Sequence, residues 1–414
     1  MNDLDQYSLF DPEVVENPFA YYALVREQAP VHRTSMGFYL VSTHALCVEA
    51  MRDPEAFSSR FGAAMSGGAS GRASSGKGGR ASGRIEEAPL PVTDTLLTND
   101  PPSHTRFRKL VNKAFSPGRV QQMDSYVSKT ANDLIDGFAE RRELELVERF
   151  AVPLPLTVIA DQLGVPRADM GDFKKWSDAS VAPLGGMISE QEQVDCARLV
   201  IELQKYLADR CEERRASPTD DLLSDLVHAS VDGESPLSTA EVISVAQQFL
   251  VAGNETTTHL IAASFMFLLE NPAQLERLRA DPSLIPNAVE ESLRCETPVQ
   301  GMWRVAARDV ELGGEMIPKG SFVMLRYAAA NRDPAMFSDP ERFDVGRENA
   351  REHLSFGLGI HFCPGAALAR KEAAVALSLM LDRFPSLRLA GGNDFAHHPS
   401  MLLRGLKRLD LELR

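Results

Sequence analysis

Residues 356–370 read FGLGIHFCPGAALAR and place Cys363 between a glycine-bearing loop and a predicted helix. Glycine permits the positive φ angles that a tight loop of this kind needs. Proline suits the first position of a helix, so the pattern predicts a helix from about Pro364 to Leu381. The free amides and the dipole at the start of that helix face the sulfur. They favour a thiolate, which is either a metal ligand or a nucleophile.

Other interpretations of Cys363 compete with a metal site. A lone cysteine beside a helix is usually a small buried apolar residue. Zinc is disfavoured because no second cysteine or histidine pair lies at ligand spacing, and His361 is too near Cys363 in sequence to chelate with it. A cysteine nucleophile with a histidine base stays open at this stage. Motifs elsewhere in the chain have to decide among these interpretations.

The composition is that of an acidic chain with few cysteines for its length. Its 414 residues are enough to bury a large core, and a net charge of −14 disfavours nucleic acid as a partner. The five cysteines are scattered and odd in number, which fits a reducing compartment and predicts a cytoplasmic protein. No signal peptide and no apolar run of membrane-spanning length is found, so we expect no membrane anchor.

Helical periodicity dominates the chain and predicts a single domain over residues 1–414, mainly α with small β-sheets. Residues 66–84 differ, because glycine, serine and basic residues predominate there and predict a flexible loop. The pattern predicts a helix that follows residues 16–18 and runs to about 28, further helices at 44–52, 103–114 and 121–139, and a strand at 37–41.

A long helix is predicted from Ser238 to Glu270. Ser238 and Glu241 form a capping box at its start, and Asn271-Pro272 ends it. At ~1.5 Å per residue the helix is on the order of 50 Å long and must cross the molecule. Apolar residues on most of its faces indicate a helix of the buried core.

The motif Ala252-Gly253-Asn254-Glu255-Thr256 interrupts the apolar pattern of this helix. Ala252 and Gly253 leave room on one face for a bulky or diatomic ligand. Glu255 and Thr256 put a carboxylate and a hydroxyl beside that gap, where polar groups need a partner or a function to offset burial. The alternative is a helix kink in which Thr256 bonds a backbone carbonyl of its own helix.

The Phe-x-x-Gly-x-x-x-Cys-x-Gly spacing, carried by Phe356, Cys363 and Gly365, resembles the haem-binding loop of the cytochrome P450 family. The resemblance extends over nearly the whole chain, from about Asn17 to Arg414. It implies the P450 fold, a triangular helical domain with a minor β region. It also implies a haem b (iron protoporphyrin IX) whose iron is ligated by the Cys363 thiolate.

The middle of the long helix is similar to the oxygen-binding motif of the same family. By that resemblance Ala252 and Gly253 border the cofactor. Thr256 would steady the oxygen species on the iron, and Glu255 would relay protons to it from solvent. Splitting the O–O bond needs two protons, so an acid and an alcohol belong there.

Further residues take roles from the family positions. Glu291 and Arg294 match the family's Glu-x-x-Arg pair, share a helix face, and are interpreted as a structural brace for the cysteine loop. The positions that match haem-propionate partners are His104, Arg108, Arg304 and His361. The positions that match a substrate pocket are Gln248, Val251, Ala252, Gln300, Gly301, Met302, Leu402 and Leu403.

The resemblance implies a monooxygenase that inserts one oxygen atom of O2 into a C–H or C=C bond of a small apolar molecule. The chain has no dinucleotide-binding fingerprint, so electrons from NAD(P)H would arrive through a separate reductase and a ferredoxin or flavodoxin. A monomer is expected. An acidic partner would dock on a basic face formed by Arg106, Lys109, Lys113 and Lys371.

Two other functions fit the same fold. A peroxide-using enzyme is disfavoured by the acid–alcohol pair of Glu255 and Thr256. A haem sensor or carrier would need neither proton delivery nor a docking face. The chain also departs from the family pattern twice. Residues 66–84 are long for a substrate-access loop, where we expect a flexible lid, and Pro364 stands where bacterial members commonly have a residue with an N–H.

Overall fold

The computed structural model describes residue 4 and residues 7–62, 93–114, 123–230 and 236–414, without the side chains of residues 113 and 114. The predicted loop at 66–84 lies outside these residues. The described helices are α1 (Pro12–Glu16), α2 (Phe19–Gln28), α3 (His44–Arg52), α5 (Ser103–Ala114), α7 (Asp124–Asp136), α8 (Pro153–Gln162), α9 (Met170–Val181), α10 (Glu190–Ala216), α11 (Leu222–Val227), α12 (Thr239–Glu270), α13 (Pro272–Ala280), α14 (Ile285–Glu296), α15 (Tyr327–Ala330) and α16 (Ala366–Arg383). The described strands are β1 (Val31–Arg33), β2 (Tyr39–Val41), β3 (Phe57–Ser58), β4 (Glu143–Glu145), β5 (Met302–Ala306), β6 (Val310–Leu312), β7 (Glu315–Ile317), β8 (Phe322–Leu325), β9 (Arg388–Leu389) and β10 (Asp410–Glu412).

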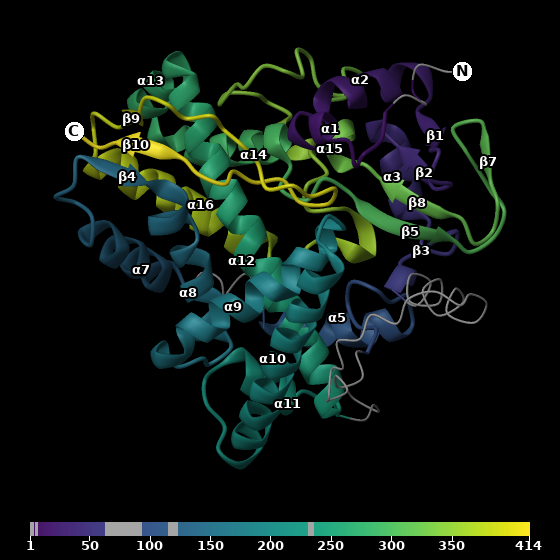
Figure 1. Cartoon of the computed structure of the whole chain (residues 1–414), viewed down its shortest axis with the longest axis horizontal. Helices are drawn as coiled ribbons and strands as arrows, with labels where there is room; N and C mark the ends of the chain where they lie inside the picture. The colour runs from purple at the N-terminus through teal and green to yellow at the C-terminus, as the bar shows by residue number, and fades with distance from the viewer. Residues whose placement is uncertain (1–3, 5–6, 63–92, 115–122, 231–235) are drawn as a thin grey trace.

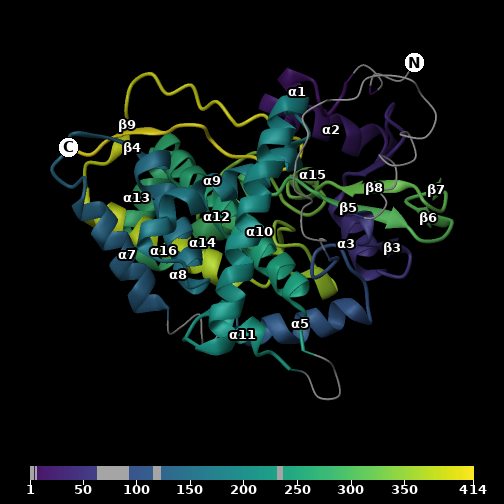
Figure 2. The same cartoon turned by 60° about the horizontal axis from the view of Figure 1, so that its bottom comes forward.

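The fold is mainly α-helical with small β-sheets, as the sequence predicts, and its outline in Figure 1 is roughly triangular. One sheet has the strand order β1-β2-β8-β5-β3 and lies on the same side of the molecule as α3. A second sheet, with the order β4-β10-β9, lies near the C-terminus, and β6 and β7 form a hairpin. Figure 2 shows that the long helices gather on the other side of the molecule from the first sheet.

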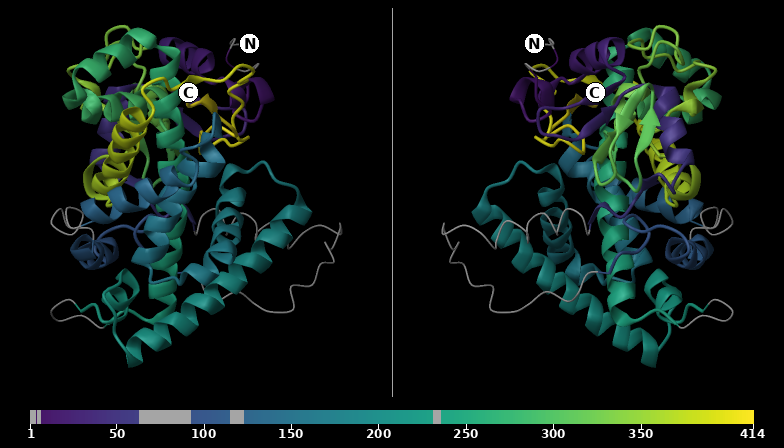
Figure 3. Two further views of the ribbon diagram at one scale, coloured as in Figure 1. Left: turned by 90° about the vertical axis from the view of Figure 1, so that its left-hand side faces the viewer. Right: turned by 90° about the vertical axis from the view of Figure 1, so that its right-hand side faces the viewer.

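The predicted central helix is confirmed as α12. The Ser238 hydroxyl accepts the Glu241 amide, and the Glu241 carboxylate accepts the Ser238 amide, so the capping box is present. Asn271 ends the helix ahead of Pro272. α12 packs against α8, α14 and α16, and Figure 3 shows α10 lying obliquely to it. Because most of its residues are buried, α12 forms the core on which the site is built.

Two segments far apart in sequence meet beside the start of β5. This strand pairs antiparallel with β8, which sets Arg304 opposite Val323. The backbone amide of Gln300, just before the strand, donates to the Leu402 carbonyl at 2.8 Å. The structure therefore brings together the two groups of pocket residues that the family positions suggest near residues 300 and 402.

A buried carboxylate at the end of α14 holds the C-terminal segment in place. Glu296 is 2% exposed, and its Oε1 lies 2.9 Å from His397 Nε2 and 3.3 Å from Arg404 Nε. Burial alone would raise the pKa of Glu296, but Arg404 and His397 lower it to about 2. In the folded protein the carboxylate therefore stays charged at pH values well below the usual pKa of a glutamate.

This pairing predicts a loss of stability in acid. The pKa of Glu296 is lower in the folded chain than in the unfolded chain, so its contribution is complete above about pH 4.5 and disappears as pH falls toward 2. The contribution is on the order of 3 kcal/mol. We expect Glu296→Gln to flatten the pH dependence of the unfolding free energy in this window, measured by urea denaturation. Glu140→Gln, at an exposed position, is the control, and equal slopes for the wild type and Glu296→Gln would contradict the assignment.

Candidate active site

The loop before Cys363 folds as its glycines predict. Gly357 and Gly359 have φ of 66° and 70°, and the Cys363 amide donates to the Phe356 carbonyl at 2.9 Å. The helix that follows starts at Ala366 with Gly365 as its N-cap, so the predicted start at Pro364 was two residues early. The first residues after the cysteine form a turn instead, which directs the next amides at the sulfur.

The ionisation of the Cys363 thiol corrects a second prediction. Burial raises its pKa above the usual value, although the amides of Gly365 and Ala366 and the charges of Arg108 and Arg370 act in the opposite direction. The helix start alone therefore does not make the thiolate the favoured form. A coordinated metal ion does, because it deprotonates a thiol ligand outright.

The cysteine loop is braced from α16 and α14. The Arg370 guanidinium lies 4.5 Å from the centre of the Phe356 ring. Its Nε donates to Glu290 Oε1 at 2.8 Å, and the other oxygen of Glu290 lies 3.0 Å from His353 Nε2. Burial would raise the pKa of Glu290, but His353 and Arg370 lower it to about 2. This ion-pair network, which the sequence analysis missed, fixes Phe356 against the loop.

The four predicted propionate partners form one cluster beside the loop. The rings of His104 and His361 lie 4.3 Å apart between centroids, and His361 Nε2 lies 2.9 Å from Ser59 Oγ. Burial and the charges of Arg304, His104 and Arg108 lower the pKa of His361 to about 3. Burial and Arg108 also lower the pKa of His104. The cluster thus sets two neutral imidazoles next to two guanidinium groups.

This cluster needs an anionic acceptor. The side chains whose charges act on His361 are those of Arg304, His104 and Arg108, and none of these is a carboxylate. His104 is 2% exposed, and its Nε2 is buried without a hydrogen-bond partner in the described part of the chain. A buried donor without a partner is costly. Carboxylates at the edge of a planar cofactor near Cys363 would meet this need, so the residues present fit a haem.

On α12, the run of buried residues is interrupted at Ala252. This residue is exposed, whereas most of the residues on either side of the motif are buried. Thr256 Oγ1 donates to the Ala252 carbonyl at 2.7 Å, which is the local bond considered as the alternative for this motif. Its lone pairs remain available to accept a hydrogen bond. A Cβ at Gly253 would lie 3.5 Å from Ile159 on α8, so Ala252, rather than Gly253, provides the space.

Glu255 has basic neighbours that the sequence analysis missed. His259 Nε2 lies 3.4 Å from Glu255 Oε1, one helical turn further along α12. Burial would raise the pKa of Glu255, but His259, Lys174 and His398 hold it below its usual value. The spacing of i and i+4 was a visible signal for His259. Lys174 on α9 and His398 in the C-terminal segment come from elements that no local pattern connects to α12.

The ion pair predicted between Glu291 and Arg294 is present and fully buried. Arg294 Nε and Nη2 donate to the two Glu291 oxygens at 2.8 Å each, and both side chains are 0% exposed. Arg347 Nε also lies 2.9 Å from Glu291 Oε1. Arg294 donates further to the carbonyls of Asn331 and Pro340, in the segment that leads to the cysteine loop.

Known proteins share this arrangement of helices. A family model described as Cytochrome P450 matches residues 180–403. The chain belongs to the cytochrome P450 family. It is 44% identical over 316 residues to cytochrome P450 107B1 of Saccharopolyspora erythraea, covering 76% of each protein. It is 43% identical to 6-deoxyerythronolide B hydroxylase of the same organism, over 76% of this chain and 77% of that protein. A similar solved structure is the cytochrome P450 PksS of the bacillaene polyketide synthase of Bacillus subtilis 168. It matches with a TM-score of 0.86 and 32% sequence identity, and the match covers 98% of this chain and 99% of that one.

This P450 is therefore a monooxygenase, an oxidoreductase with a haem cofactor that uses O2, an organic substrate and redox partners. None of the described helices is long and apolar enough to cross a membrane.

The residues suggested to line a substrate pocket in this P450 differ in how deeply they are buried. Gln300 is 2% exposed and its amide is used within the protein, accepting from Tyr22 and donating to the carbonyls of Glu296 and Thr297. A Cβ at Gly301 would lie 2.5 Å from the Leu325 carbonyl, so this side of the residue faces β8. Gln300 and Gly301 are therefore not substrate contacts, contrary to the prediction from the family positions. The partly exposed positions are Gln248, Val251, Met302, Leu402 and Leu403.

The basic face suggested for partner docking is only partly free. Arg106 is paired with Glu241 at 2.7 Å, and Lys371 with Asp124 at 2.9 Å. Lys109 is exposed, and the side chain of Lys113 lies outside the described part of the chain. Arg106 and Lys371 are therefore removed from the docking surface, because the charge of each is already matched by a carboxylate.

Proposed function

We propose that this P450 holds haem b through the Cys363 thiolate. His104, Arg108, Arg304 and His361 would then bind the propionates. The observation that carries this assignment is the partly buried cluster of two imidazoles and two guanidinium groups beside Cys363, in which His104 Nε2 has no hydrogen-bond partner among the described residues. When bound, haem supplies the redox chemistry that activates O2.

The residues of α12 would control proton supply and space. The exposed face at Ala252 leaves room for O2 and the reacting carbon of the substrate. Thr256 Oγ1, which donates to the Ala252 carbonyl, would accept a hydrogen bond in that space. Glu255 is ionised at neutral pH, so it would take up a proton from one side and release it on the other.

The substrate is proposed to be a largely apolar molecule contacted by Val251, Met302, Leu402 and Leu403. The partly exposed Gln248 would add a polar contact to the substrate. In the structure its amide donates a hydrogen bond to the Thr95 hydroxyl and accepts one from the Leu97 amide. One similar protein is a 6-deoxyerythronolide B hydroxylase and another belongs to a polyketide synthase. These names support polyketide-derived compounds as the first to be screened, by the shift of the Soret band on binding.

Electrons are proposed to come from NAD(P)H through a reductase and a ferredoxin, with a flavodoxin as the other carrier. Lys109 on α5 is exposed, and Arg108 one position earlier donates to the Phe362 carbonyl of the cysteine loop. A partner bound at α5 would therefore lie close to the ligand loop. Acidic partners would be steered to Lys109, and weaker reduction at higher salt is expected.

The ferrous–CO difference spectrum tests the central assignment. We expect the strongly red-shifted Soret band of thiolate-ligated haem, and its loss in Cys363→Ala. Cys47→Ala is the matched control, because Cys47 is buried against the first sheet and is expected to leave the band in place. A wild-type band at the position of histidine-ligated haem would refute Cys363 as the ligand. Product formed with hydrogen peroxide alone, and none with NAD(P)H and partners, would favour the peroxide-using alternative.

A further inference from the structure

The contact between His259 and Glu255 has no role in the function proposed so far. His259 is 3% exposed, and its Nε2 faces the Glu255 carboxylate at 3.4 Å. Its other ring nitrogen, Nδ1, is also buried and has no hydrogen-bond partner among the described residues. An imidazole with one nitrogen on an acid and the other unpaired is arranged to pass a proton rather than to hold a structure together.

The fold makes room for this imidazole at a specific glycine. A Cβ at Gly405 would lie only 1.7 Å from His259 Nδ1, so no other residue at position 405 is compatible with this ring position. Gly405 lies in the C-terminal segment, where its carbonyl accepts the His398 amide at 3.0 Å. The ring of His398 lies 6.4 Å from that of His259 between centroids. The unpaired nitrogen of His259 therefore faces the C-terminal segment, away from Glu255.

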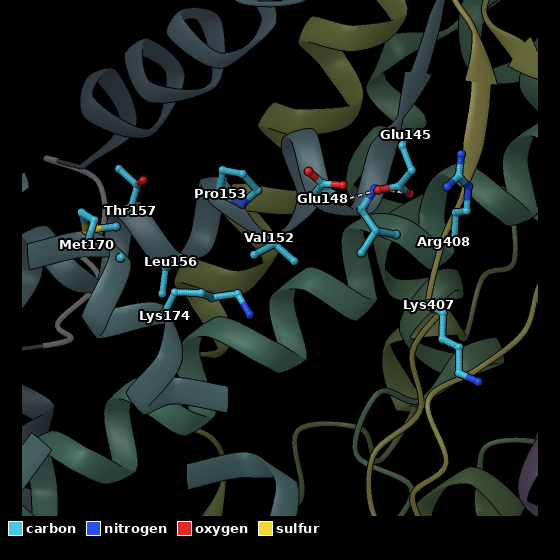
Figure 4. Close-up of a pocket in the computed structure, with 12 residues that line it drawn as sticks. Glu145, Glu148, Val152, Pro153, Leu156, Thr157, Met170, Lys174, Lys407 and Arg408 are labelled. Atoms are coloured by element: carbon cyan, nitrogen blue, oxygen red, sulfur yellow. Dashed lines mark hydrogen bonds between the residues drawn. The ribbon is translucent and has the colours of Figure 1, made fainter. Parts of the chain in front are cut away.

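Solvent approaches the same segment through a hollow of about 640 Å³ between α8, α9 and the C-terminal segment. Its charged lining includes Glu145, Glu148, Lys174, Lys407 and Arg408. Figure 4 shows the Lys174 amine directed toward the side of the hollow on which Lys407 and Arg408 lie.

The charges around the hollow act on the groups beside His259. Burial and the charges of His259, Lys407 and Lys174 lower the pKa of His398, and Glu255 acts in the opposite direction. Lys174 also acts on Glu255 itself. Glu255, His259, His398, Lys174 and Lys407 thus form one electrostatically coupled set drawn from α9, α12 and the C-terminal segment.

We propose that His259 relays protons from this hollow to Glu255, which rests on the proposed role of Glu255 as the acid. A proton from water reaches Nδ1 past His398, and the proton on Nε2 moves to Glu255 Oε1. One proton arrives at Nδ1 and one leaves from Nε2, so the imidazole is neutral again but in its other tautomer. A ring flip or proton exchange with water restores the starting tautomer. No electrons move in this step. His259 acts through Glu255 and is a positioning and relay residue.

The test compares the holoenzymes of the wild type and His259→Gln, supplied with reductase, ferredoxin, NAD(P)H and substrate. Glutamine keeps a hydrogen bond to Glu255 and cannot carry a proton through. We expect product per NAD(P)H to fall roughly tenfold or more, with hydrogen peroxide released instead and a larger solvent deuterium isotope effect, because positioned proton transfer contributes about 10²–10⁴-fold. The ferrous–CO band should be unchanged. His228→Gln is the matched control, because His228 is exposed and lies just after α11, outside α12.

A second readout separates this relay from the proposed function. In the resting enzyme, without O2 or reductant, His259→Gln should raise the pH at which the infrared band of the Glu255 carboxyl appears, because His259 lowers the pKa of Glu255. Glu255→Gln identifies that band. An unchanged isotope effect and product yield in His259→Gln, or a loss in His228→Gln of the same size, would overturn the relay. If the wild type forms no product, the proposed function fails, and the infrared titration still decides whether His259 and Glu255 are coupled. His259→Asn serves if the glutamine variant does not fold.

Discussion

Replacing Arg294 with methionine should destabilise the protein by about 3–5 kcal/mol, the largest effect on stability that the structure predicts. The substitution leaves Glu291 buried with half of its charge partners removed, since Arg347 alone stays at 2.9 Å. It also removes the donors to the carbonyls of Asn331 and Pro340. A buried charge that loses its partner costs more than the pair itself contributed.

The measurement is the unfolding midpoint in urea, followed by haem absorbance and by far-ultraviolet circular dichroism. We expect the haem signal to change at lower urea than the helical signal in Arg294→Met, because the affected segment leads to the cysteine loop. Arg383→Met is the control: Arg383 pairs with Asp136 at the surface, where both side chains are about half exposed, and such pairs contribute roughly 1 kcal/mol or less. A midpoint for Arg294→Met equal to that of the control would show that the buried pair does not brace the loop.

Local signals in the sequence were sufficient for the elements that carry the site. The capping box of Ser238 and Glu241 set the start of α12, and the i,i+3 spacing placed Glu291 against Arg294. These predictions succeed because the interacting groups lie within one helical turn. The start of α16 was missed by two residues, because Gly365 rather than Cys363 became the N-cap.

What the sequence did not reveal depends on contacts between distant segments. Gln300 was expected to contact the substrate, but the Tyr22 hydroxyl, on α2, donates a hydrogen bond to its amide oxygen. Burial of Cys363 outweighs the amides that point at its sulfur, so the pKa of the thiol rises. The room for His259 comes from Gly405, which lies on a different segment. Burial and long-range packing set each of these outcomes, and neither is encoded in a local pattern.

Replacing Glu255 with glutamine should lower product formed per NAD(P)H on the order of 100-fold, the largest expected effect on catalysis. Glutamine keeps the size and polarity of the side chain but cannot exchange a proton at this position. Electrons would still reach the haem, so NAD(P)H consumption should continue while hydrogen peroxide accumulates. Glu270→Gln is the matched control, since it makes the same change at the far end of α12. The wild-type product yield in Glu255→Gln would show that protons arrive by a route that avoids this carboxylate.

The double variant Glu255→Gln/His259→Gln extends the same argument. If His259 acts only through Glu255, the double variant should lose no more activity than Glu255→Gln alone, because the relay has no acceptor once the carboxylate is gone. Losses that multiply would mean that each residue supplies protons independently. His259 Nε2 lies 3.4 Å from Glu255 Oε1, and its other nitrogen faces the C-terminal segment. This geometry places the two residues in series, so we expect the smaller loss.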